Sequence, residues 1–485
     1  MTDDLSVVLL SNRGPISFVE SDDEFTIKRG AGGLAGALDP VARRLGDRAV
    51  WIATATSKTD RKALAAGAAD GLAEQLGYPV YMLDIEPGVY SRYYDLVSNR
   101  MLWFANHCLW DEVNIEGFSE EEIAAWDEAY EPVNERFARA VIEVAEPDSL
   151  VLFQDYHLST APAKLRARRP LLTIFHFTHS SFCGPEGLGR LPHPIPGRII
   201  EGMLGADLIG FHVHAWCENF LACCEEIGAQ VDRTEGTVDF KEQRSWVRAY
   251  PIPIDAPELE ERARARKAQE WAERFRSNTS GQLIVRADRT EPSKNIVRGF
   301  KAFALLLDRR PDLRGQVRFV ACLYPSRQSM DEYQAYIAEI EKTVDEINEK
   351  YPNSIELFNR DDYDRTLGAL IVYDVLLINP IMDGMNLVAK EGPAVNRNAG
   401  ALVLSQEAGA FEELGEYAVQ IKDAHDIEET AGALEQALEL DQSEKNRRQE
   451  KLRATVRAST PDDWINTQIR DLEQLKEKGR PETSL

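Results

Sequence analysis

The stretch Leu283-Ile-Val-Arg-Ala-Asp-Arg-Thr-Glu-Pro-Ser-Lys-Asn295 decides the fold class, because a strand pattern passes through a polar loop into a helix pattern. The apolar run from Leu283 to Ala287 predicts a strand, and residues Lys294 to Leu307 predict the helix that follows. A strand, a loop and a helix in this order begin a βαβ unit, and repeated units of this kind build a parallel sheet.

The same alternation of strand and helix patterns runs along the whole chain. The predicted strands are nearly continuous apolar runs, which is typical of parallel sheets covered by helices on both faces. In the first half we expect strands over 5–10, 49–53, 80–83, 149–153, 171–175 and 207–211, and a capped helix from Ser119 toward Ala145. In the second half we expect strands over 283–287, 317–323, 375–379 and 401–404, and helices over 294–307, 330–350 and 385–396. The sequence therefore predicts an α/β protein with two doubly wound parallel sheets.

The domain organisation follows from the length and from one proline-containing segment. At about 150 residues per domain, a chain of 485 residues could hold roughly three domains, and two large ones fit equally well. Two prolines interrupt the pattern in Tyr250-Pro-Ile-Pro-Ile-Asp255, where we place a boundary. We expect an N-terminal domain over 1–252 and a C-terminal domain over 253–458, with a last helix over about 459–478 packed back on the first domain.

Charge and hydropathy exclude several classes of protein. The 81 acidic and 56 basic side chains give a net charge of −25, which would repel nucleic acid and anionic lipid. No run approaches the roughly 18 consecutive apolar residues of a membrane helix, and the N-terminus lacks an export-signal pattern. The six cysteines are too few and too irregularly spaced for a disulfide scaffold. We therefore expect a cytoplasmic protein with reduced thiols that binds neither nucleic acid nor membrane.

Three loops carry residue types that bind phosphate and sugar. Glycines in Arg29-Gly-Ala-Gly-Gly-Leu34 open a helix and let backbone amides approach an anion, with a plain structural turn as the alternative. Arg289 and Lys294 lie five residues apart across a strand-to-helix loop, so they either converge on one diphosphate or form a solvated charge pair. Asp383-Gly384 turns into a helix whose Glu391 either accepts hydrogen bonds from a ribose diol or is a solvated carboxylate.

These loops and further motifs occur in the order of one enzyme family. The chain reads Ser11-Asn-Arg13, Gly32-Gly-Leu34, Tyr93-Tyr94 followed by Leu102-Trp103, Asp155-Tyr-His-Leu158, His176 at a strand end, Asp288-Arg-x-Glu-x-x-Lys294, Pro325-Ser-Arg327 and Asp383-Gly-Met-Asn-Leu-Val-Ala-Lys-Glu391. Over most of residues 5 to 470 it resembles the retaining glycosyltransferases of the trehalose-6-phosphate synthase family. The resemblance implies the GT-B fold, two Rossmann-like domains with the active site between them.

The resemblance also implies an activity, the transfer of glucose from a nucleotide diphosphate glucose to glucose 6-phosphate. Donor-binding residues would be Gly32, Gly33, His176, Arg289, Lys294, Asp383, Gly384, Met385, Asn386, Leu387 and Glu391. Acceptor-binding residues would be Arg13, Tyr94, Trp103, Asp155 and Arg327. Of all these, Asp155, His176, Arg289, Lys294 and Asp383 would be catalytic. An aromatic plane and a carboxylate suit a sugar, and arginines suit a phosphate dianion.

Some features of the family leave the substrates open. The segment Thr290-Glu-Pro-Ser-Lys-Asn295 resembles the actinobacterial branch, which includes users of GDP-sugars, and on this resemblance we favour GDP-glucose over UDP-glucose as the donor. Where many members carry a Trp-x-Gly-Trp-like segment in the acceptor wall, this chain reads Trp51-Ile-Ala-Thr54. The alternatives are a pseudo-glycosyltransferase that couples a GDP-cyclitol to an aminocyclitol phosphate and a sugar-phosphate sensor without turnover. The oligomeric state is also open, a homo-oligomer included.

The histidines and cysteines could in principle bind a metal. His176, His179 and Cys183, like the group at 212, 214 and 217, contain ligand types but lack the regular pair spacing of zinc sites. We therefore expect no metal. No cofactor is expected either, because the nucleotide sugar would be a substrate.

Overall fold

A computed structural model describes residues 6–21, 24–30, 33–279, 281–328 and 330–477 of the chain. The chain divides into two compact units. Unit 1 is formed within Met1–Trp110, Ile115–Pro251 and Pro461–Leu485, and unit 2 comprises Asp111–Asn114 and Ile252–Thr460. The chain thus passes into unit 2 in the proline-containing segment and returns to unit 1 at its last helix.

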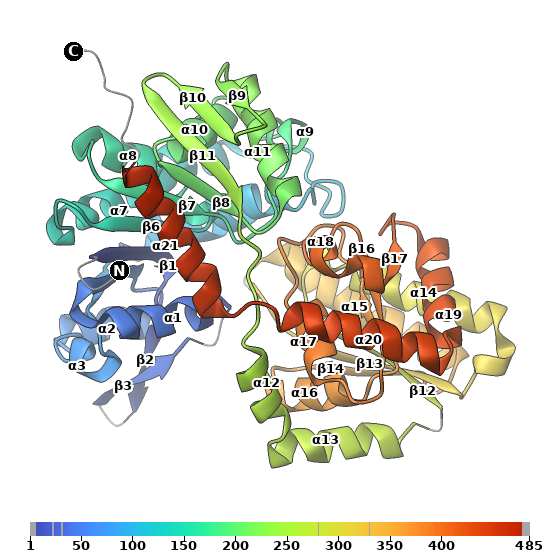
Figure 1. The fold of residues 1–485 in the computed structure, drawn as a ribbon. Coiled ribbons are helices and arrows are strands. Elements are labelled where there is room, and N and C mark those ends of the chain that lie inside the picture. Colours follow the sequence, from blue (N-terminus) through green and yellow to red (C-terminus); the bar gives the residue numbers. More distant parts are fainter. Residues whose placement is uncertain (1–5, 22–23, 31–32, 280, 329, 478–485) are drawn as a thin grey trace. The chain divides into compact units, whose positions relative to one another are not determined.

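Unit 1 is built on a nine-stranded sheet (Figure 1). Its strands, in spatial order, are β5 (Val80–Leu83), β4 (Ala49–Thr54), β1 (Val7–Arg13), β6 (Leu150–Gln154), β7 (Thr173–Phe177), β8 (Leu208–Phe211), β11 (Gln243–Ala249), β10 (Thr237–Phe240) and β9 (Gln230–Asp232). The pairs from β5 to β11 are parallel, as predicted. The prediction of a purely parallel sheet is wrong at one edge, where β9, β10 and β11 pair antiparallel. The turns between these three strands are too short for a parallel crossover.

The helices of unit 1 connect the strands, and most follow the predicted alternation. They are α1 (Gly33–Leu45), α2 (Lys58–Ala65), α3 (Leu72–Leu76), α4 (Pro87–Ser91), the π-helical η2 (Arg92–Trp103), α5 (Phe104–Asn106), α6 (Glu120–Ala125), the π-helical η3 (Trp126–Tyr130), α7 (Glu131–Val144), α8 (Ala161–Arg168), α9 (Pro185–Leu188), α10 (Ile195–Met203), α11 (His214–Glu226) and α21 (Pro461–Glu477), with short 3₁₀ turns η1 (Gly46–Arg48) and η4 (Tyr156–Leu158). A hairpin of β2 (Ile16–Ser21) and β3 (Glu24–Arg29) was not predicted.

Two local contacts in unit 1 concern helices that the sequence analysis predicted. The predicted helix start at Ser119 is confirmed, because its hydroxyl accepts from the amide of Glu122 at 3.2 Å and the Glu122 carboxylate accepts from the Ser119 amide at 2.7 Å. The C-terminal helix α21 lies beside α1 (Figure 1), and Arg44 pairs with Asp462 at 2.8 Å. The last helix therefore belongs to the packing of the first unit, far from its neighbours in sequence.

Unit 2 is built on a six-stranded sheet in which every strand pair is parallel. Its strands, in spatial order, are β14 (Ile355–Asn359), β13 (Val317–Tyr324), β12 (Gln282–Arg289), β15 (Val375–Ile378), β16 (Ala401–Ser405) and β17 (Val419–Ile421). The helices are α12 (Ala256–Ala263), α13 (Arg266–Ser277), α14 (Ile296–Arg309), α15 (Asp331–Lys350), α16 (Tyr363–Val372), α17 (Val388–Val395), α18 (Phe411–Leu414), α19 (Ile427–Glu439) and α20 (Gln442–Val456), with 3₁₀ turns η5 (Pro292–Lys294), η6 (Pro311–Leu313) and η7 (Gly415–Tyr417). The continuous apolar strands are buried on both faces, as the sequence pattern predicted.

The starts of two helices in unit 2 differ from the prediction in a way that shapes the loops. Helix α17 begins at Val388 and not at Met385, because Asn386 has the left-handed backbone angle φ 70°. Helix α14 begins at Ile296 and not at Lys294, because Asn295 has φ 56°. Lys294 therefore ends the 3₁₀ turn η5 ahead of α14, and residues 383–387 lie in loop backbone ahead of α17.

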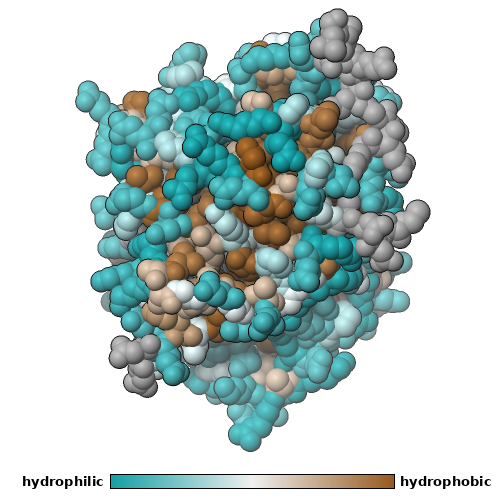
Figure 2. All heavy atoms as spheres, turned by 90° about the vertical axis from the view of Figure 1, so that its left-hand side faces the viewer, coloured by the Kyte–Doolittle hydropathy of each residue, from teal (hydrophilic) through white to brown (hydrophobic). Residues whose placement is uncertain are grey.

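The surface and the core agree with the composition. Hydrophilic residues cover most of the face drawn in Figure 2, and apolar residues lie between them in smaller groups. In the described part of the chain, no helix is both long and apolar enough to cross a membrane. None of the six cysteines, all of which are described, forms a disulfide.

Candidate active site

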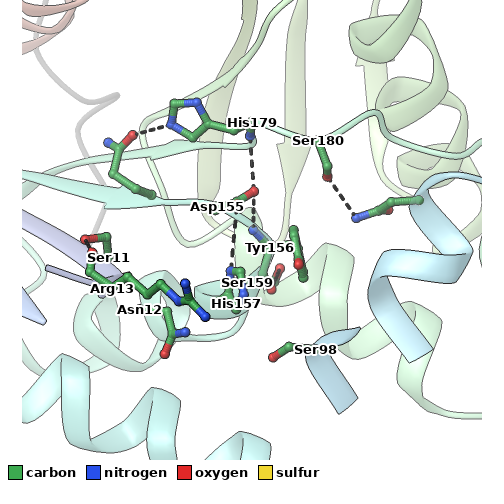
Figure 3. A network of polar contacts seen from close by, with 12 residues as sticks. Ser11, Asn12, Arg13, Ser98, Asp155, Tyr156, His157, Ser159, His179 and Ser180 are labelled. Carbon is green, nitrogen blue, oxygen red and sulfur yellow. Dashed lines mark hydrogen bonds and ion pairs between the residues drawn. The ribbon is translucent and has the colours of Figure 1, made fainter. Parts of the chain in front are cut away.

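In unit 1, several predicted site residues lie at the carboxyl ends of neighbouring parallel strands, where ligands of such sheets bind. Arg13 ends β1, Asp155 directly follows β6, and His176 is the penultimate residue of β7. Figure 3 shows Arg13 and Asp155 on this side of the sheet together with His157. The strand pairings of β1 with β6 and of β6 with β7 bring these three positions to one edge.

The side chain of Arg13 is oriented by an aromatic stack. Its Nη2 donates to the hydroxyl of Tyr94 at 3.2 Å, and its guanidinium lies 5.6 Å from the centre of the same ring. Tyr94, on η2, stacks between Tyr90 at 5.6 Å and His157 at 5.8 Å between ring centres. A guanidinium held by one edge presents its other donors in a fixed plane, which suits a phosphate.

The backbone of Asp155 is strained and its carboxylate is anchored. The residue has φ 74°, which is uncommon for a residue with a side chain and costs on the order of 1 kcal/mol. Its Oδ1 accepts from the amides of Tyr156 at 3.1 Å and His179 at 3.2 Å (Figure 3). The imidazole Nδ1 of His157 lies 3.7 Å from Oδ2. Strain of this kind is retained where the position of a side chain matters.

The two tryptophans named in the sequence analysis are both buried. Trp103 is packed against His107 and Tyr156, with ring centres 3.8 and 5.9 Å apart. Trp51 is fully buried in β4, where its Nε1 donates to the hydroxyl of Ser11 at 2.8 Å. Trp51 is therefore a core residue, and the departure from the family pattern at 51–54 lies in the sheet itself.

His176 is fully buried, although the imidazole ring is polar. Within the part of the chain that the structure describes, neither ring nitrogen has a hydrogen-bond partner. Burial lowers the pKa of His176 to about 3, so the ring is neutral at ordinary pH. A neutral imidazole can donate one hydrogen bond and accept another, and an orphaned buried pair of nitrogens points to a ligand group.

In unit 2, the two predicted diphosphate cations lie at the carboxyl end of β12, each beside a carboxylate. Arg289 is the last residue of the strand, with Nη1 3.1 Å from Oε1 of Glu291. Lys294 forms an ion pair with Asp383 and is only 11% exposed, so the pair is not a solvated surface feature. Burial works against the charge of Lys294, but Asp383 outweighs it and raises the pKa, while Arg289 opposes this rise. The two cations therefore lie within electrostatic range of each other.

The loop after β15 is held by a side-chain contact of its own and by the backbone of the loop after β16. Oδ2 of Asp383 accepts from the side-chain amide of Asn386 at 3.0 Å, and the Asp383 carbonyl accepts from Gly409 N at 3.0 Å. A Cβ at Gly409 would lie 2.1 Å from the carbonyl oxygen of Gly384, so only glycine permits this approach. Met385 is buried, and Leu387 directly precedes α17. The segment from Asp383 to Leu387, which was predicted to bind the donor, is thus a fixed loop ahead of α17 and not the first turn of that helix.

Glu391 lies one turn into α17, where its amide donates to the carbonyl of Leu387 at 2.8 Å. The side chain is half-buried, and burial raises the pKa of Glu391 to about 7. The carboxyl group therefore changes charge near neutral pH.

The structure adds a buried ion pair that the sequence reasoning missed. Arg286, fully buried inside β12, donates from Nε and Nη2 to Oδ2 of Asp288 at 3.0 and 2.8 Å. Its Nη2 also donates to the carbonyl of Lys294 at 2.9 Å, so the pair fixes the loop that carries the lysine. The signal was present, because an arginine interrupts an otherwise apolar strand at 283–287.

Arg327 lies in unit 2, beside Glu291, which follows the end of β12. Its Nη1 donates to Oε1 of Glu291 at 2.6 Å and to the hydroxyl of Tyr333 at 3.2 Å. Of the predicted glycines, Gly33 begins α1 and Gly32 lies outside the described residues. Among the residues that the structure describes, no cluster of three or more His, Cys, Asp or Glu side chains could hold a metal ion.

Comparison with known proteins places this geometry in a family. The family model for glycosyltransferase family 20 matches residues 5–474. A trehalose-6-phosphate synthase of Mycobacterium sp. (strain JLS) is 33% identical over 98% of this chain and 97% of its own. Another from Mycolicibacterium vanbaalenii is 34% identical over 95% and 94%.

A solved structure agrees with this assignment over the full length. A UDP-forming alpha,alpha-trehalose-phosphate synthase from Burkholderia vietnamiensis superimposes with a TM-score of 0.81 at 26% identity, covering 97% of this chain and 100% of that one. The fold is therefore GT-B, as the resemblance implied, and the family match spans both units. The chain belongs to glycosyltransferase family 20.

Proposed function

We propose that the protein transfers a glucosyl group from a nucleotide diphosphate glucose to the anomeric hydroxyl of glucose 6-phosphate and so forms trehalose 6-phosphate. The observation that carries this proposal is the full-length similarity to proteins named trehalose-6-phosphate synthase, at 33% and 34% identity. The site supports it, since cations and anchored carboxylates lie at the carboxyl ends of the strands in each unit.

The donor would bind mainly to unit 2. Arg289 and Lys294 would hold the diphosphate. The backbone amides of Gly384 to Leu387 would lie beside the donor sugar, and the Asp383 carboxylate would accept hydrogen bonds from the hydroxyl groups of this sugar. Glu391 would accept from the ribose diol. His176, neutral and with two buried ring nitrogens that lack partners, would bond the 6-hydroxyl of the donor sugar.

The acceptor would be read by its phosphate and by its sugar. Arg13, Tyr94 and Arg327 would bind the phosphate dianion, because arginines and a hydroxyl supply the N–H and O–H donors that a phosphate accepts. Asp155 and Trp103 would contact the sugar, the first through hydroxyl groups. Two backbone amides already hold the Asp155 carboxylate in one orientation.

The proposed reaction retains the configuration at the transferred carbon without a covalent intermediate. The bond from the anomeric carbon to the diphosphate oxygen breaks, and a bond to the acceptor hydroxyl forms on the same face. The hydroxyl proton passes to the departing diphosphate oxygen. Arg289 and Lys294 would stabilise the negative charge that grows on this oxygen, which is catalysis by positioning and electrostatics and needs no metal.

For the donor nucleotide we propose GDP-glucose in preference to UDP-glucose, on the likeness of residues 290–295 to the actinobacterial branch. The competing donor is UDP-glucose, since one structural relative is named UDP-forming and a further one, from E. coli and 26% identical, was solved with UDP-2-fluoro glucose. The test is kcat/KM for GDP-, UDP- and ADP-glucose with glucose 6-phosphate. We expect GDP-glucose to give the highest value, and a higher value for UDP-glucose would contradict the preference. Binding of both substrates without turnover would favour the sensor, and turnover only with cyclitol substrates would favour the pseudo-glycosyltransferase.

A further inference from the structure

Glu291 lies at the centre of the cationic cluster in unit 2. Its side chain is completely buried, and one oxygen, Oε1, forms ion pairs with both Arg289 and Arg327. Nη1 of Arg327 lies 2.6 Å and Nη1 of Arg289 lies 3.1 Å from this oxygen, and the hydroxyl of Ser326 donates to it at 2.9 Å. The other oxygen, Oε2, is buried and has no hydrogen-bond partner among the described residues.

In this arrangement two positively charged guanidiniums, those of Arg289 and Arg327, share one carboxylate, that of Glu291. A buried carboxylate is costly unless cations and hydrogen bonds compensate it. Burial alone would favour the neutral acid, but Arg289 and Arg327 outweigh it and hold the pKa of Glu291 below its usual range. In return the carboxylate cancels part of the repulsion between the two guanidiniums. Because both guanidiniums contact the same oxygen, neither can be displaced without changing the surroundings of the other.

We propose that Glu291 is a positioning residue shared by the two substrate sites: it orients Arg289 toward the donor diphosphate and Arg327 toward the acceptor phosphate. The proposal rests on the proposed function, which gives these two arginines their substrates. A guanidinium carries five N–H donors, more than the contact with Glu291 uses, so each arginine can hold the carboxylate and a phosphate together. Glu291 touches neither substrate in this proposal and acts through the arginines.

The first test is Glu291→Gln, which keeps the shape of the side chain and removes its charge. We expect KM for the nucleotide-glucose donor and KM for glucose 6-phosphate each to rise at least about fivefold, the loss expected for a weakened charged hydrogen bond. The matched control is Glu356→Gln on β14. Glu356 also bridges two arginines, with Arg318 Nη2 at 2.8 Å and Arg274 Nη2 at 3.8 Å, outside the site. The control should leave both KM values within about twofold of the unchanged enzyme.

A double-mutant cycle separates positioning from a general loss of stability. In an Arg327→Ala background, Glu291→Gln should no longer raise KM for glucose 6-phosphate but should still raise KM for the donor. A rise in only one of the two KM values in the single variant, or equal effects with and without Arg327, would overturn the proposal. So would a lowered melting temperature with both KM values unchanged. If Glu291→Gln does not fold, Glu291→Asp, which keeps the charge but shortens its reach, is measured against the same outcomes.

Failure of this proposal differs from failure of the proposed function. The unchanged enzyme is assayed first with glucose 6-phosphate and each nucleotide-glucose. If it transfers no glucosyl group, the proposed function fails and takes the shared role of Glu291 with it. If it does transfer, the KM values of the variants decide the role of Glu291 alone.

Discussion

At the scale of single residues, the proposed function assigns Lys294 to the charge that develops on the leaving diphosphate. The lysine is nearly buried and keeps its charge through Asp383, so its field is little weakened by water. Charge on the departing diphosphate is largest in the transition state, and a cation there should stabilise that state more than the bound substrate.

We therefore expect Lys294→Ala to lower kcat at least about 100-fold and to raise KM for the donor much less, as for the loss of a charge-stabilising donor at the reacting atoms. Lys301→Ala is the control, because this lysine lies on the neighbouring helix α14, is half exposed and is 3.9 Å from Glu339. Steady-state kinetics with saturating glucose 6-phosphate measure both. A Lys294→Ala enzyme with normal kcat and only a raised donor KM would show that the residue binds ground state and transition state equally.

As the proposed ribose ligand, Glu391 would make donor binding dependent on pH. Its pKa is raised to about 7 by burial, so in the free enzyme it gains its negative charge as the pH rises through 7. An ionised carboxylate accepts from a ribose diol better than a neutral acid. We expect KM for the nucleotide-glucose to fall between about pH 6 and pH 8, and Glu391→Gln to remove this dependence. A donor KM that has the same pH profile in both proteins would exclude Glu391 as the ribose ligand.

The raised pKa of Glu391 also affects the stability of the folded chain, which falls as the pH rises. Between the ordinary pKa of a glutamate and about 7, the folded chain holds a proton on Glu391 that the unfolded chain has lost. Its contribution therefore disfavours the folded state progressively as the pH rises through this window, and fully above it. Under the proposed function, the ionised Glu391 that favours donor binding at neutral pH would therefore lower the stability of the folded chain.

At the scale of elements, the loop after β15 depends on a glycine that the sequence reasoning did not single out. Gly409 approaches the carbonyl of Gly384 so closely that a Cβ would overlap it. We expect Gly409→Ala to lower the melting temperature by several degrees and to reduce turnover, because Gly384 must move and the Asp383 loop with it. Gly432→Ala is the control, since a Cβ there meets nothing within 4 Å and α19 should tolerate or gain from alanine. Equal melting temperatures for the two variants would contradict the close approach.

Most elements of the fold could be predicted, and the misses have specific causes. Continuous apolar runs locate strands such as β12 and β15 because both faces of the sheet are covered. The start of α17 was wrong by three residues, since nothing in the letters Met385-Asn386-Leu387 reveals that Asn386 adopts a left-handed backbone. The antiparallel edge of the first sheet was missed because short alternating strands have a weaker pattern than buried ones.

The candidate site was predictable as motifs but not as contacts. The sequence brought Arg289, Lys294 and Asp383 into consideration, and the structure shows which cation faces which carboxylate. It could not reveal that Arg327 and Arg289 share Glu291, because that contact joins the ends of β12 and β13. Such pairings depend on sheet order and register, which are set by tertiary packing.

At the scale of the whole molecule, the proposed function requires an acidic protein to bind two anionic substrates. Against the net charge of −25, each unit carries cations of its own: Arg13 in unit 1, and Arg289, Lys294 and Arg327 in unit 2. At a Debye length of about 8 Å in physiological salt, exposed charges far from the site are screened, while partly buried cations are screened much less. Local charge, not net charge, therefore decides what these units can bind.

The most direct test of the central claim is identification of the product. The protein is incubated with a nucleotide diphosphate glucose labelled at the anomeric carbon and with glucose 6-phosphate, and the product is examined by nuclear magnetic resonance and mass spectrometry. The account predicts one product, trehalose 6-phosphate, with the label at an α anomeric carbon in an α,α-1,1 linkage and one nucleoside diphosphate released per linkage formed. Release of free labelled glucose without a disaccharide phosphate, a β-linked product, or binding of both substrates with no product would contradict it.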